Sequence, residues 1–588
     1  MKTLLQQITI RLEQAFEQAG YDKSYGRVTR SNRPDLCEYQ CNGAMAAAKA
    51  YKKAPILVAN DVLACLVDCD MFEQKEAVHP GFINLKVTGS VLCTHLKEMY
   101  VCEKLGVRQE EVPKTIVVDY GGPNVAKPLH VGHLRAAIIG ESVKRLMRFK
   151  GNQVIGDIHL GDWGYQMGLI IAELERRQPN LPYFDEDFDG VYPAESPFTI
   201  AELEEIYPTA SAFAKENEAF RENALEKTYL LQSGHKGYFA IWRHIMDVSV
   251  ADLKKNYQDL NVEFDLWKGE ADVQKYIPDM VEMLKEKGYA HLDEGALVVD
   301  VAQEGDKKEI PPCMILKSDG AALYSTTDLA TLIERERKYS PAQVIYVVDK
   351  RQGLHFTQVF RCAKKAGIVP EATRLDFLGF GTMNGTDGKP FQTRAGGVMR
   401  LENLIHEIND EMLIKIKDNR TVTEEAALAT AKMIGLAAVK YGDLSNQASK
   451  DYVFDVERFA SFEGNTGPYI LYTIVRIKSI LNRFVKTEKS LEGLAFGFAT
   501  TEHEKALMLE VVHFPEMIQD AYEDLAPHKI CAYIYDLANA LNKFYHETKI
   551  LAEEDERKKE GYIALLLLVK EILEQAIWIL GFEAPERM

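Results

Sequence analysis

The chain has 588 residues, 46% of them apolar and 10% aromatic, which is enough to form hydrophobic cores in about three or four domains. Its formal net charge of −18 at pH 7 argues against a uniformly basic nucleic-acid-binding protein, although a local basic surface is compatible with it. No apolar run has the length of a membrane span, and the first residues form an amphipathic pattern and not a signal peptide, so we expect a cytoplasmic protein.

The nine cysteines do not predict a metal site. Cys37 and Cys41, like Cys65 and Cys69, are separated by three residues, whereas zinc hairpins commonly use two, and no histidine completes the set. We therefore expect free thiols and no metal bound by the protein.

Residues 1–112 are expected to form a small α+β domain. Apolar residues recur at helical spacing in Leu4–Phe16, an alanine-rich helix is predicted at Ala44–Ala50, and Phe82–Val87 has the composition of a strand. Basic residues form no stripe here, so the residues alone indicate only a folded module.

A strand, a tight loop and a helix follow one another after Pro113. The β-branched run Thr115–Val118 leads into a loop broken by glycine and proline, and helical spacing begins near His130 and His133. In an open α/β sheet this order places the helix N-terminus beside the strand end, where free N–H groups favour phosphate. On spacing alone, a phosphate site and a structural turn are equally supported.

The strand pattern returns at Gln153–His159, Ala296–Val301, Met314–Lys317 and Gln343–Asp349, with helical stretches between. This alternation predicts a parallel, doubly wound sheet whose polar strand ends converge on one cleft. Residues 185–268 are acidic and helix-rich, and we interpret them as an insertion between the two halves of the sheet.

From about residue 437 onward the pattern is helical. Basic residues gather on the first helix of the C-terminal region, at Arg476, Lys478 and Arg483. A solvated helix face explains them from the residues alone, and a track for a nucleic-acid backbone is the alternative.

The segment PNVAKPLHVGHLRAA, residues 123–137, resembles the first signature of class I aminoacyl-tRNA synthetases, whose histidine motif is here His130-Val131-Gly132-His133. The longer block that starts at Asp119 and Tyr120 is similar to that of arginyl-tRNA synthetases. Further similar motifs follow in order along nearly the whole chain.

The resemblance implies an α/β catalytic domain with a class I, Rossmann-like, doubly wound parallel sheet over residues 113–456. It also implies an N-terminal α+β appended domain that binds tRNA, residues 1–112, and an all-α anticodon-binding domain, residues 457–588. The implied activity is an arginine-specific ligase that forms arginyl-adenylate from L-arginine and ATP. The arginyl group then passes to the 3′-terminal ribose of tRNA(Arg), with release of AMP and pyrophosphate. ATP would enter as its Mg²⁺ complex, and members of the family are mostly monomers.

The residues that bind arginine are likewise implied by the resemblance. They are Asp119, Asn124, Tyr324, Asp328 and Gln352. Carboxylates, amides and a phenol can satisfy the five donors of a guanidinium group, which a lysine ammonium cannot match. Buried ion pairs and helix caps are the alternative explanation for the two aspartates.

The residues implied for ATP lie on the signature turn and on a later segment. They are Pro123, Lys127, His130, Gly132, His133, Met383 and Arg394. Lys127, His130, His133 and Arg394 would be catalytic, because they would hold the phosphate charge of the transition state. Arg476, Lys478 and Arg483 would contact tRNA.

The chain departs from most class I synthetases in its second signature. It has no Lys-Met-Ser-Lys-Ser loop, and the equivalent region, residues 380–397, has Gln392 before Thr393. Lys127 is expected to substitute for the missing lysine, as is thought for many arginyl enzymes. A glycine-rich surface turn is the alternative for this region.

Other functions stay open at this point. A nucleotidyltransferase that adenylates a small acid would not need the helical C-terminal region, and a tRNA-binding paralogue without catalysis would not need the signature residues. A synthetase for another amino acid is disfavoured by Tyr324, Asp328 and Gln352.

Overall fold

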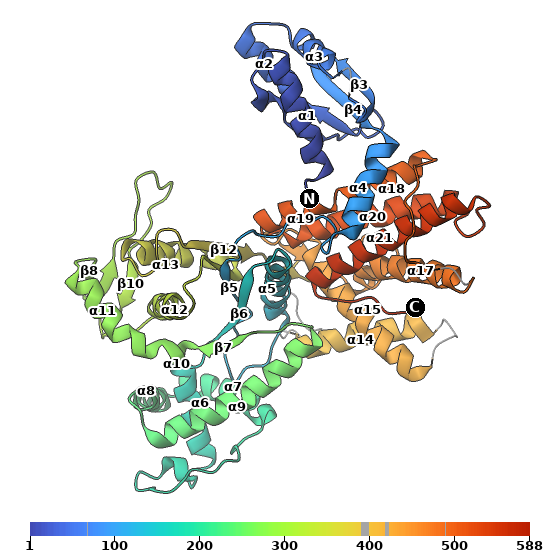
Figure 1. Ribbon diagram of the computed structural model, residues 1–588. Helices are drawn as coiled ribbons and strands as arrows, with labels where there is room; N and C mark the ends of the chain where they lie inside the picture. The colour runs from blue at the N-terminus through green and yellow to red at the C-terminus, as the bar shows by residue number, and fades with distance from the viewer. Residues whose placement is uncertain (67–68, 390–398, 418–422, 488–489) are drawn as a thin grey trace.

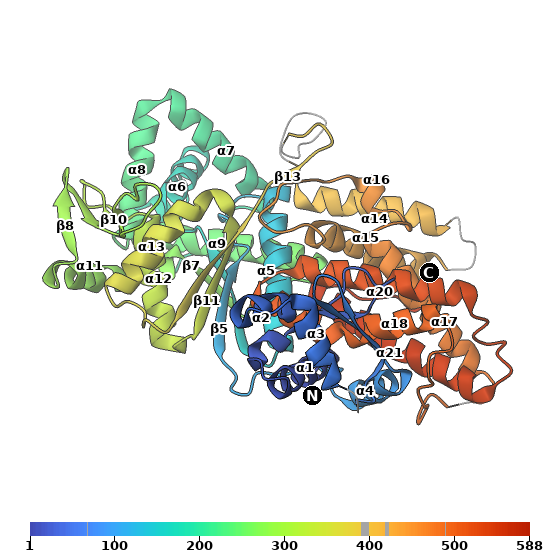
Figure 2. The same ribbon diagram turned by 90° about the horizontal axis from the view of Figure 1, so that it is seen from above.

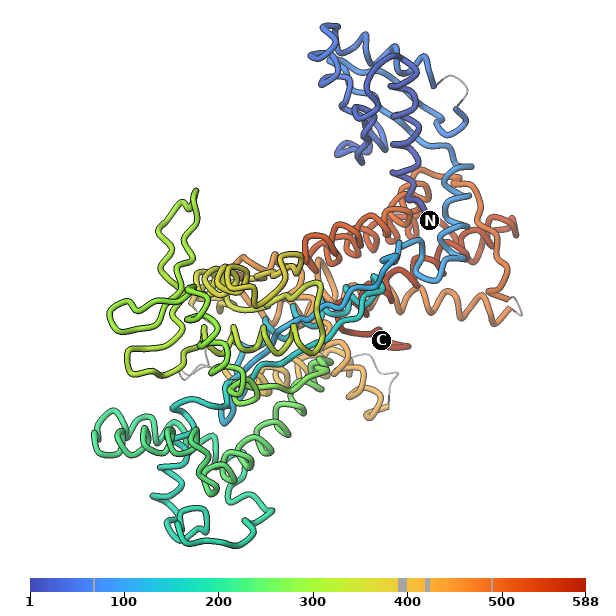
Figure 3. The backbone as a smooth tube through the Cα atoms, turned by 60° about the vertical axis from the view of Figure 1, so that its left-hand side comes forward, coloured from blue at the N-terminus to red at the C-terminus, as the bar shows by residue number. Residues whose placement is uncertain are grey.

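The computed structural model describes residues 1–66, 69–389, 399–417, 423–487 and 490–588. An N-terminal α+β domain, a central α/β domain and a C-terminal helical bundle follow one another along the chain (Figure 1). The N-terminal domain stands on the bundle, and the helical insertion of the central domain lies at the opposite end of the molecule, as both Figure 1 and Figure 3 show.

The N-terminal domain has a four-stranded antiparallel sheet in the order β1-β2-β4-β3. Its opening helix buries Leu4, Ile8, Leu12 and Phe16, so the predicted helical face is confirmed. The elements are α1 (Leu4–Gln18), β1 (Val28–Arg30), β2 (Tyr39–Cys41), α2 (Gly43–Tyr51), α3 (Pro55–Ala64), β3 (Phe72–Val78), β4 (Phe82–Val87) and α4 (Gly89–Val101).

The central domain is built on a five-stranded parallel sheet in the order β12-β11-β5-β6-β7, which confirms the predicted doubly wound sheet. The chain runs outward from β5 in one direction and later returns to its other side, so the strand order reverses between β5 and β11. Ligands bind at such a switch point in open α/β sheets. The strands are β5 (Thr115–Tyr120), β6 (Gln153–Leu160), β7 (Leu266–Gly269), β11 (Gln343–Asp349) and β12 (Arg374–Phe380).

Helices cover both faces of this sheet (Figure 2). Ile116, Val118 and Tyr120 of β5 belong to a core shared with α5, whereas Val117 belongs to a second core with α12 and α13. The alternation of side chains along β5 therefore places Asp119 on the side of α12. The covering helices are α5 (Val131–Phe149), α12 (Tyr324–Tyr339) and α13 (Gly353–Lys365), whereas α6 (Tyr165–Arg177) packs against the helices of the insertion.

The strands predicted at Ala296–Val301 and Met314–Lys317 exist but do not continue the parallel sheet, which corrects the sequence interpretation. They form a separate antiparallel sheet in the order β10-β9-β8. The physical reason is the tight turn at Glu294 and Gly295, both with positive φ, which can only return the chain beside itself. The strands are β8 (Ala290–Asp293), β9 (Ala296–Val299) and β10 (Cys313–Leu316), and α10 (Glu270–Val273) and α11 (Ile277–Glu286) precede them.

The acidic insertion is helical, as predicted, but ends earlier than residue 268. Leu266–Gly269 forms the edge strand β7, paired in parallel with β6. A four-residue strand shows too little periodicity to be separated from the helices before it. The helices are α7 (Ile200–Glu216), α8 (Glu218–Gln232) and α9 (Lys236–Asp259).

In the described residues from 399 onward, the regular structure is helical except for one short strand, β14 (Tyr452–Val453), which pairs in parallel with β13 (Met383–Asn384). The helices are α14 (Leu401–Lys417), α15 (Glu424–Leu444), α16 (Val456–Phe459), α17 (Gly467–Val485), α18 (Glu502–Val512), α19 (Phe514–Glu523), α20 (Pro527–Glu547) and α21 (Glu556–Leu580). Among the described residues, no helix combines the length and the apolar character that a bilayer crossing requires.

Candidate active site

The turn between β5 and α5 places two histidines at the start of a helix. Nδ1 of His130 accepts a hydrogen bond from the backbone N–H of Gly132 at 3.0 Å, and Nδ1 of His133 accepts one from the backbone N–H of His130 at 3.2 Å. Each neutral ring therefore carries its proton on Nε2, which can donate to an anion. A Cβ atom at Gly132 would lie 2.7 Å from the His130 ring, so a larger residue would disturb this cap.

Both imidazoles are uncharged at neutral pH. Burial, with the neighbouring His130 and Lys127, lowers the pKa of His133 to about 3, and burial, with Lys127, also lowers the pKa of His130. Nζ of Lys127 lies 4.5 Å from the centroid of the Tyr207 ring on α7, so the insertion helps to hold this lysine. Two Nε2–H donors, an ammonium group and a helix N-terminus together suit a polyphosphate.

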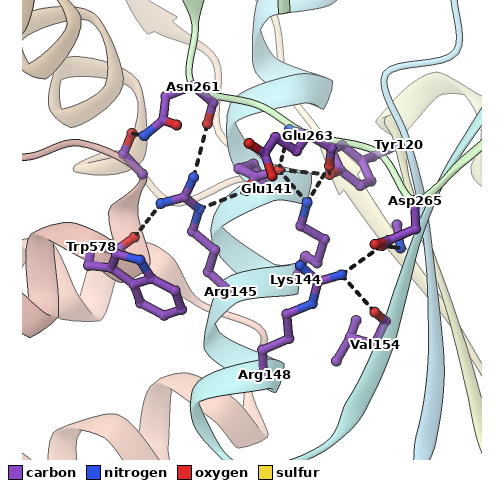
Figure 4. A network of polar contacts seen from close by, with 12 residues as sticks. Tyr120, Glu141, Lys144, Arg145, Arg148, Val154, Asn261, Glu263, Asp265 and Trp578 are labelled. Atoms are coloured by element: carbon purple, nitrogen blue, oxygen red, sulfur yellow. Dashed lines mark hydrogen bonds and ion pairs between the residues drawn. The ribbon is translucent and has the colours of Figure 1, made fainter. Parts of the chain in front are cut away.

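A buried ionic network fixes the middle of α5 (Figure 4). The Glu141 carboxylate pairs with Lys144 at 2.8 Å and with Arg145 at 2.7 Å, and it accepts a hydrogen bond from the hydroxyl of Tyr120 at 2.8 Å. Burial opposes the ionisation of Glu141, but Lys144 and Arg145 outweigh burial and lower the pKa of Glu141 to about 2.

The same network reaches two distant segments. Arg145 donates to the carbonyls of Asn261 at 3.2 Å and Trp578 at 3.1 Å, and Lys440 on α15 donates to those of Asn261 at 3.1 Å and Gly581 at 2.9 Å. Trp578 and Gly581 lie at the C-terminal end of α21, where a helix attracts cations. The helix that carries the histidines is therefore tied to the end of the insertion and to the last helix of the chain.

Asp119 is engaged by a residue that the sequence interpretation did not include. Nη2 of Arg335, on α12, lies 2.5 Å from Oδ2 of Asp119 and 2.7 Å from Oδ2 of Asp157. The strand register explains this contact, because Asp119 is aligned with Asp157 on β6 and with Tyr346 on β11. The signal in the sequence was Asp157, a carboxylate within an apolar strand, which requires a buried partner.

Asp328 and Tyr324 lie one helical turn apart on α12. Oδ2 of Asp328 lies 2.6 Å from Nε2 of His355 at the start of α13, and Tyr324 is 76% exposed. Gln352 ends the short 3₁₀ turn Lys350–Gln352 (η4) that precedes this helix. The structure thus brings together side chains of α12 and α13, and Gln352 directly precedes α13.

Glu270, which the sequence interpretation also omitted, adds negative charge near this group. Burial raises the pKa of Glu270; the charge of His159 opposes this rise and that of Asp328 adds to it. A guanidinium group bound between Glu270 and Asp328 would stabilise the ionised form of both carboxylates. Glu270 directly follows β7, and this strand was not recognised, so the sequence offered no sign of its position.

Asn124, in the loop after β5, lies beside Gly161, the residue that follows β6. It forms a β-bridge with Gly161, and a Cβ atom at Gly161 would come within 2.0 Å of the Asn124 side-chain oxygen. Backbone hydrogen bonds on either side, from Val125 N–H to the Gly161 carbonyl and from Gly161 N–H to the Pro123 carbonyl, fix this loop at 3.1 and 3.2 Å. The amide of Asn124 is therefore held over backbone that only glycine allows to approach so closely.

The residues expected to contact ATP downstream are only partly described. Met383 is buried in β13, beside β14. Arg394, Gln392 and Thr393 lie outside the described residues. The segment before them is a turn in which the N–H of Gly385 donates to the carbonyl of Lys389 at 2.8 Å.

The three basic residues of α17 do not share one environment. Lys478 is 13% exposed in its side chain and pairs with Glu574 at 3.4 Å and Glu586 at 2.7 Å. Arg476 donates to Asn542 at 2.5 Å and lies over the rings of Tyr472 and Tyr545, whereas Arg483 is exposed. At 3.6 residues per turn, Arg476 and Arg483 share a face that Lys478 does not.

No cluster of three or more His, Cys, Asp or Glu side chains with the arrangement of a metal site occurs in the described parts of the chain. All nine cysteines are free thiols.

Three family models match successive parts of the chain. They are the N-terminal domain of arginyl tRNA synthetase at residues 2–87, the catalytic domain of class I tRNA synthetases (R) at 95–456, and the DALR anticodon binding domain at 470–588. The chain is 61% identical to an arginine–tRNA ligase of Agathobacter rectalis and 57% identical to one of Alkaliphilus oremlandii, each match covering 100% of both sequences.

Solved structures share the whole architecture. The arginyl-tRNA synthetase of Plasmodium falciparum superposes with a TM-score of 0.84 at 25% identity, and that of Thermus thermophilus with 0.79 at 21%, each covering 100% of both chains. The second likeness concerns the fold alone. Sequence motifs, domain order and fold agree, and the chain belongs to the class I arginyl-tRNA synthetases, the arginine–tRNA ligases.

Proposed function

We propose that the site divides its work between the turn after β5, which binds ATP, and the ends of the neighbouring strands with α12, which bind L-arginine. One observation carries the proposal. Two neutral histidines and a lysine lie at the N-terminus of α5. The loop that carries them follows β5, at the switch point of the sheet, and carboxylates lie close together on that side of the sheet. A polyanion and a guanidinium group need these opposite environments next to each other.

In the nucleotide half, Nε2–H of His130 and His133 and the ammonium of Lys127 hold the phosphates. Gly132 and Pro123 leave room for the nucleotide, Met383 packs against adenine, and Arg394 holds pyrophosphate by analogy with the family. ATP enters as its Mg²⁺ complex. These groups favour the transition state, in which charge develops on the departing pyrophosphate, and loss of one such donor costs on the order of 10² to 10³ in rate.

In the amino-acid half, Asp328 and Tyr324 bind the guanidinium group, while Asp119, Asn124 and Gln352 complete the arginine site. Arg335 orients Asp119 in this scheme. A carboxylate oxygen of arginine attacks the α-phosphorus, the bond to the β-phosphate oxygen breaks, and pyrophosphate leaves. A terminal ribose hydroxyl of tRNA(Arg) then attacks the arginyl carbonyl, loses its proton, and displaces AMP.

We further propose the domain roles of residues 1–112, 113–456 and 457–588 as tRNA-binding, catalytic and anticodon-binding units. The matching family models for the first and last parts support these roles. A monomer working in the cytoplasm completes the proposal.

The test is aminoacylation by purified protein with arginine, ATP and tRNA(Arg), and with lysine or citrulline in place of arginine. We expect only arginine to be attached. Attachment of lysine at a comparable kcat/KM would overturn the assignment of the carboxylates, because an ammonium cannot engage a bidentate site equally well.

Lys127→Met tests the nucleotide half. It keeps the side-chain stem over Tyr207 and removes the charge, so turnover should fall by a factor on the order of 10² while the KM for arginine stays within about twofold. Tyr207→Phe, which keeps the ring, is the matched control and should remain near wild type. Turnover of the Lys127 variant within a few-fold of wild type would exclude this lysine from phosphate binding.

A further inference from the structure

The neighbouring strands β11 and β12 end at the same level, and the carboxylate of Asp451 contacts the residues that follow both strands. Asp349 of β11 is aligned with Phe380 of β12, and the next residues are Lys350 and Gly381. Oδ1 of Asp451 lies 2.8 Å from Nζ of Lys350 and accepts a hydrogen bond from the backbone N–H of Thr382 at 2.7 Å.

Each of these partners lies within two residues of a proposed substrate contact. Lys350 begins η4, whose last residue is Gln352 in the arginine half. Thr382 immediately precedes Met383 of β13 in the nucleotide half. Asp451 therefore joins the two halves through a single oxygen atom.

The segment that carries Asp451 is fixed closely enough to transmit position. The N–H of Gly381 donates to the Ala448 carbonyl at 2.9 Å, and the N–H of Tyr452 donates to the Thr382 carbonyl at 3.1 Å. A Cβ atom at Gly381 would lie 2.5 Å from Oδ1 of Asp451, so the two segments are in direct contact.

A fully buried ion pair next to this contact connects it to α5. Arg135, on α5 just after His133, pairs with Asp443 of α15 at 3.1 Å. Its Nη1 donates to the carbonyls of Gly381 at 2.7 Å and Lys450 at 3.0 Å. Arg135 of α5 thus contacts both the residue after β12 and the segment that carries Asp451.

We propose that Asp451 is a positioning residue that sets the arginine subsite and the nucleotide subsite relative to each other. It touches neither substrate in this scheme, and acts through Lys350 on Gln352 and through Thr382 on Met383. This inference rests on the proposed function, which assigns Gln352 to arginine and Met383 to ATP.

The distinguishing consequence is a joint effect on two substrates. Asp451→Ala removes the acceptor shared by both partners, and Lys350→Met removes one partner while keeping the side-chain length. For a partly exposed contact we expect Asp451→Ala to raise the KM for arginine and the KM for ATP by about threefold to fivefold each, with the KM for tRNA unchanged. The double variant should be no worse than Asp451→Ala alone, since both changes break the same link.

The matched control is Asp455→Ala. Asp455 caps α16 four residues further along the same segment and accepts from the N–H of Arg458 at 3.2 Å. Asp455→Ala removes a carboxylate acceptor from the same segment and leaves the link between the halves intact, so both KM values should stay near wild type. Equal KM changes in Asp455→Ala, or a change confined to one substrate in Asp451→Ala, would overturn the proposal.

Gln352→Ala and Met383→Ala separate this inference from the proposed function. If each raises the KM of its own substrate alone, the subsite assignments stand and the Asp451 result decides the coupling. If neither KM moves, the subsite assignments fail on their own account. A joint rise in Asp451→Ala would then contradict a path through Gln352 and Met383.

Discussion

Asp119 and Asp328 are both carboxylates of the proposed arginine half, but their partners differ. Arg335 is 1% exposed and holds Asp119 and Asp157 in a buried ionic contact, whereas Asp328 pairs with a partly exposed His355. A permanent cation, shared with Asp157, already offsets part of the charge of Asp119. The guanidinium of a substrate is therefore expected to depend more on Asp328.

Asp328→Asn should raise the KM for arginine, weakening its binding by roughly 2 to 5 kcal/mol, because an amide leaves the guanidinium poorly paired. The measurement is steady-state aminoacylation at saturating ATP and tRNA. Asp376→Asn, on β12 away from the strand ends, is the matched control and should leave this KM unchanged. An unaltered KM in Asp328→Asn would remove this residue from the arginine site.

His133→Asn should change how stability depends on pH. The pKa of His133 is lowered to about 3 from a reference value of 6.5, so below pH 6.5 the unfolded chain takes up a proton that the folded chain does not. This group therefore destabilises the fold progressively as pH falls from 6.5, by up to about 1.4 kcal/mol per pH unit.

Asparagine can still accept from the backbone N–H of His130 and cannot titrate in this range. Thermal unfolding at pH values between 7 and 5 should therefore show a shallower loss of Tm for His133→Asn than for wild type. Parallel curves would mean that His133 is protonated in the folded enzyme.

At the scale of an element, α5 is a long helix whose buried face carries charge as well as apolar side chains. One carboxylate, Glu141, faces Lys144 and Arg145, with Lys440 adding to its stabilisation. Replacing the only anion among buried cations lowers stability, because the cations then stay buried with neither a counter-charge nor contact with water.

Glu141→Gln should lower the free energy of unfolding by about 3 to 5 kcal/mol. The midpoint of urea unfolding, followed by circular dichroism, measures this change. Glu173→Gln on α6 is the control: Glu173 is buried too, but its partners Arg176 and Arg177 are 53% and 29% exposed and can be solvated. An equal decrease in the free energy of unfolding for the two variants would mean that the network around α5 stabilises the protein no more than the exposed pairs of Glu173 do.

At the scale of the whole molecule, the N-terminal domain is joined to the bundle by specific ion pairs. Lys505 of α18 pairs with Glu38 at 2.6 Å and with Glu73 at 2.7 Å, and Arg30 of β1 pairs with Glu510 at 2.6 Å. The bundle in turn contacts α5 through the carbonyl of Trp578, which accepts a hydrogen bond from Arg145. The N-terminal domain, the bundle and α5 are thus joined by a continuous series of polar contacts.

Arg483→Gln should raise the KM for tRNA by about threefold to tenfold and weaken its dependence on salt, because an exposed cation on α17 can contact a phosphate. Lys478→Gln is the matched control on the same helix. Its side chain is already paired with Glu574 and Glu586, so it should lower stability and leave the KM for tRNA unchanged. The opposite pattern would assign the tRNA track to the Lys478 face.

Local pattern determined much of this protein by itself. The β-branched run of β5, the helical spacing of α5 and the histidine motif between them are short-range features, and their elements formed as predicted because burial on both faces of a parallel strand requires such sequences. The alternation of strands and helices likewise specified a doubly wound sheet.

Tertiary structure decided which charged groups meet. Asp119 pairs with Arg335, which is 216 positions away in the chain, and Asp451 contacts both Lys350 and Thr382. Strand register and helix packing determine these contacts, and local sequence spacing does not. The short strand β7 escaped prediction for a related reason, because its pairing with β6 depends on contacts that no local periodicity encodes. The hairpin of β8 and β9 was missed at its local turn, Glu294 and Gly295.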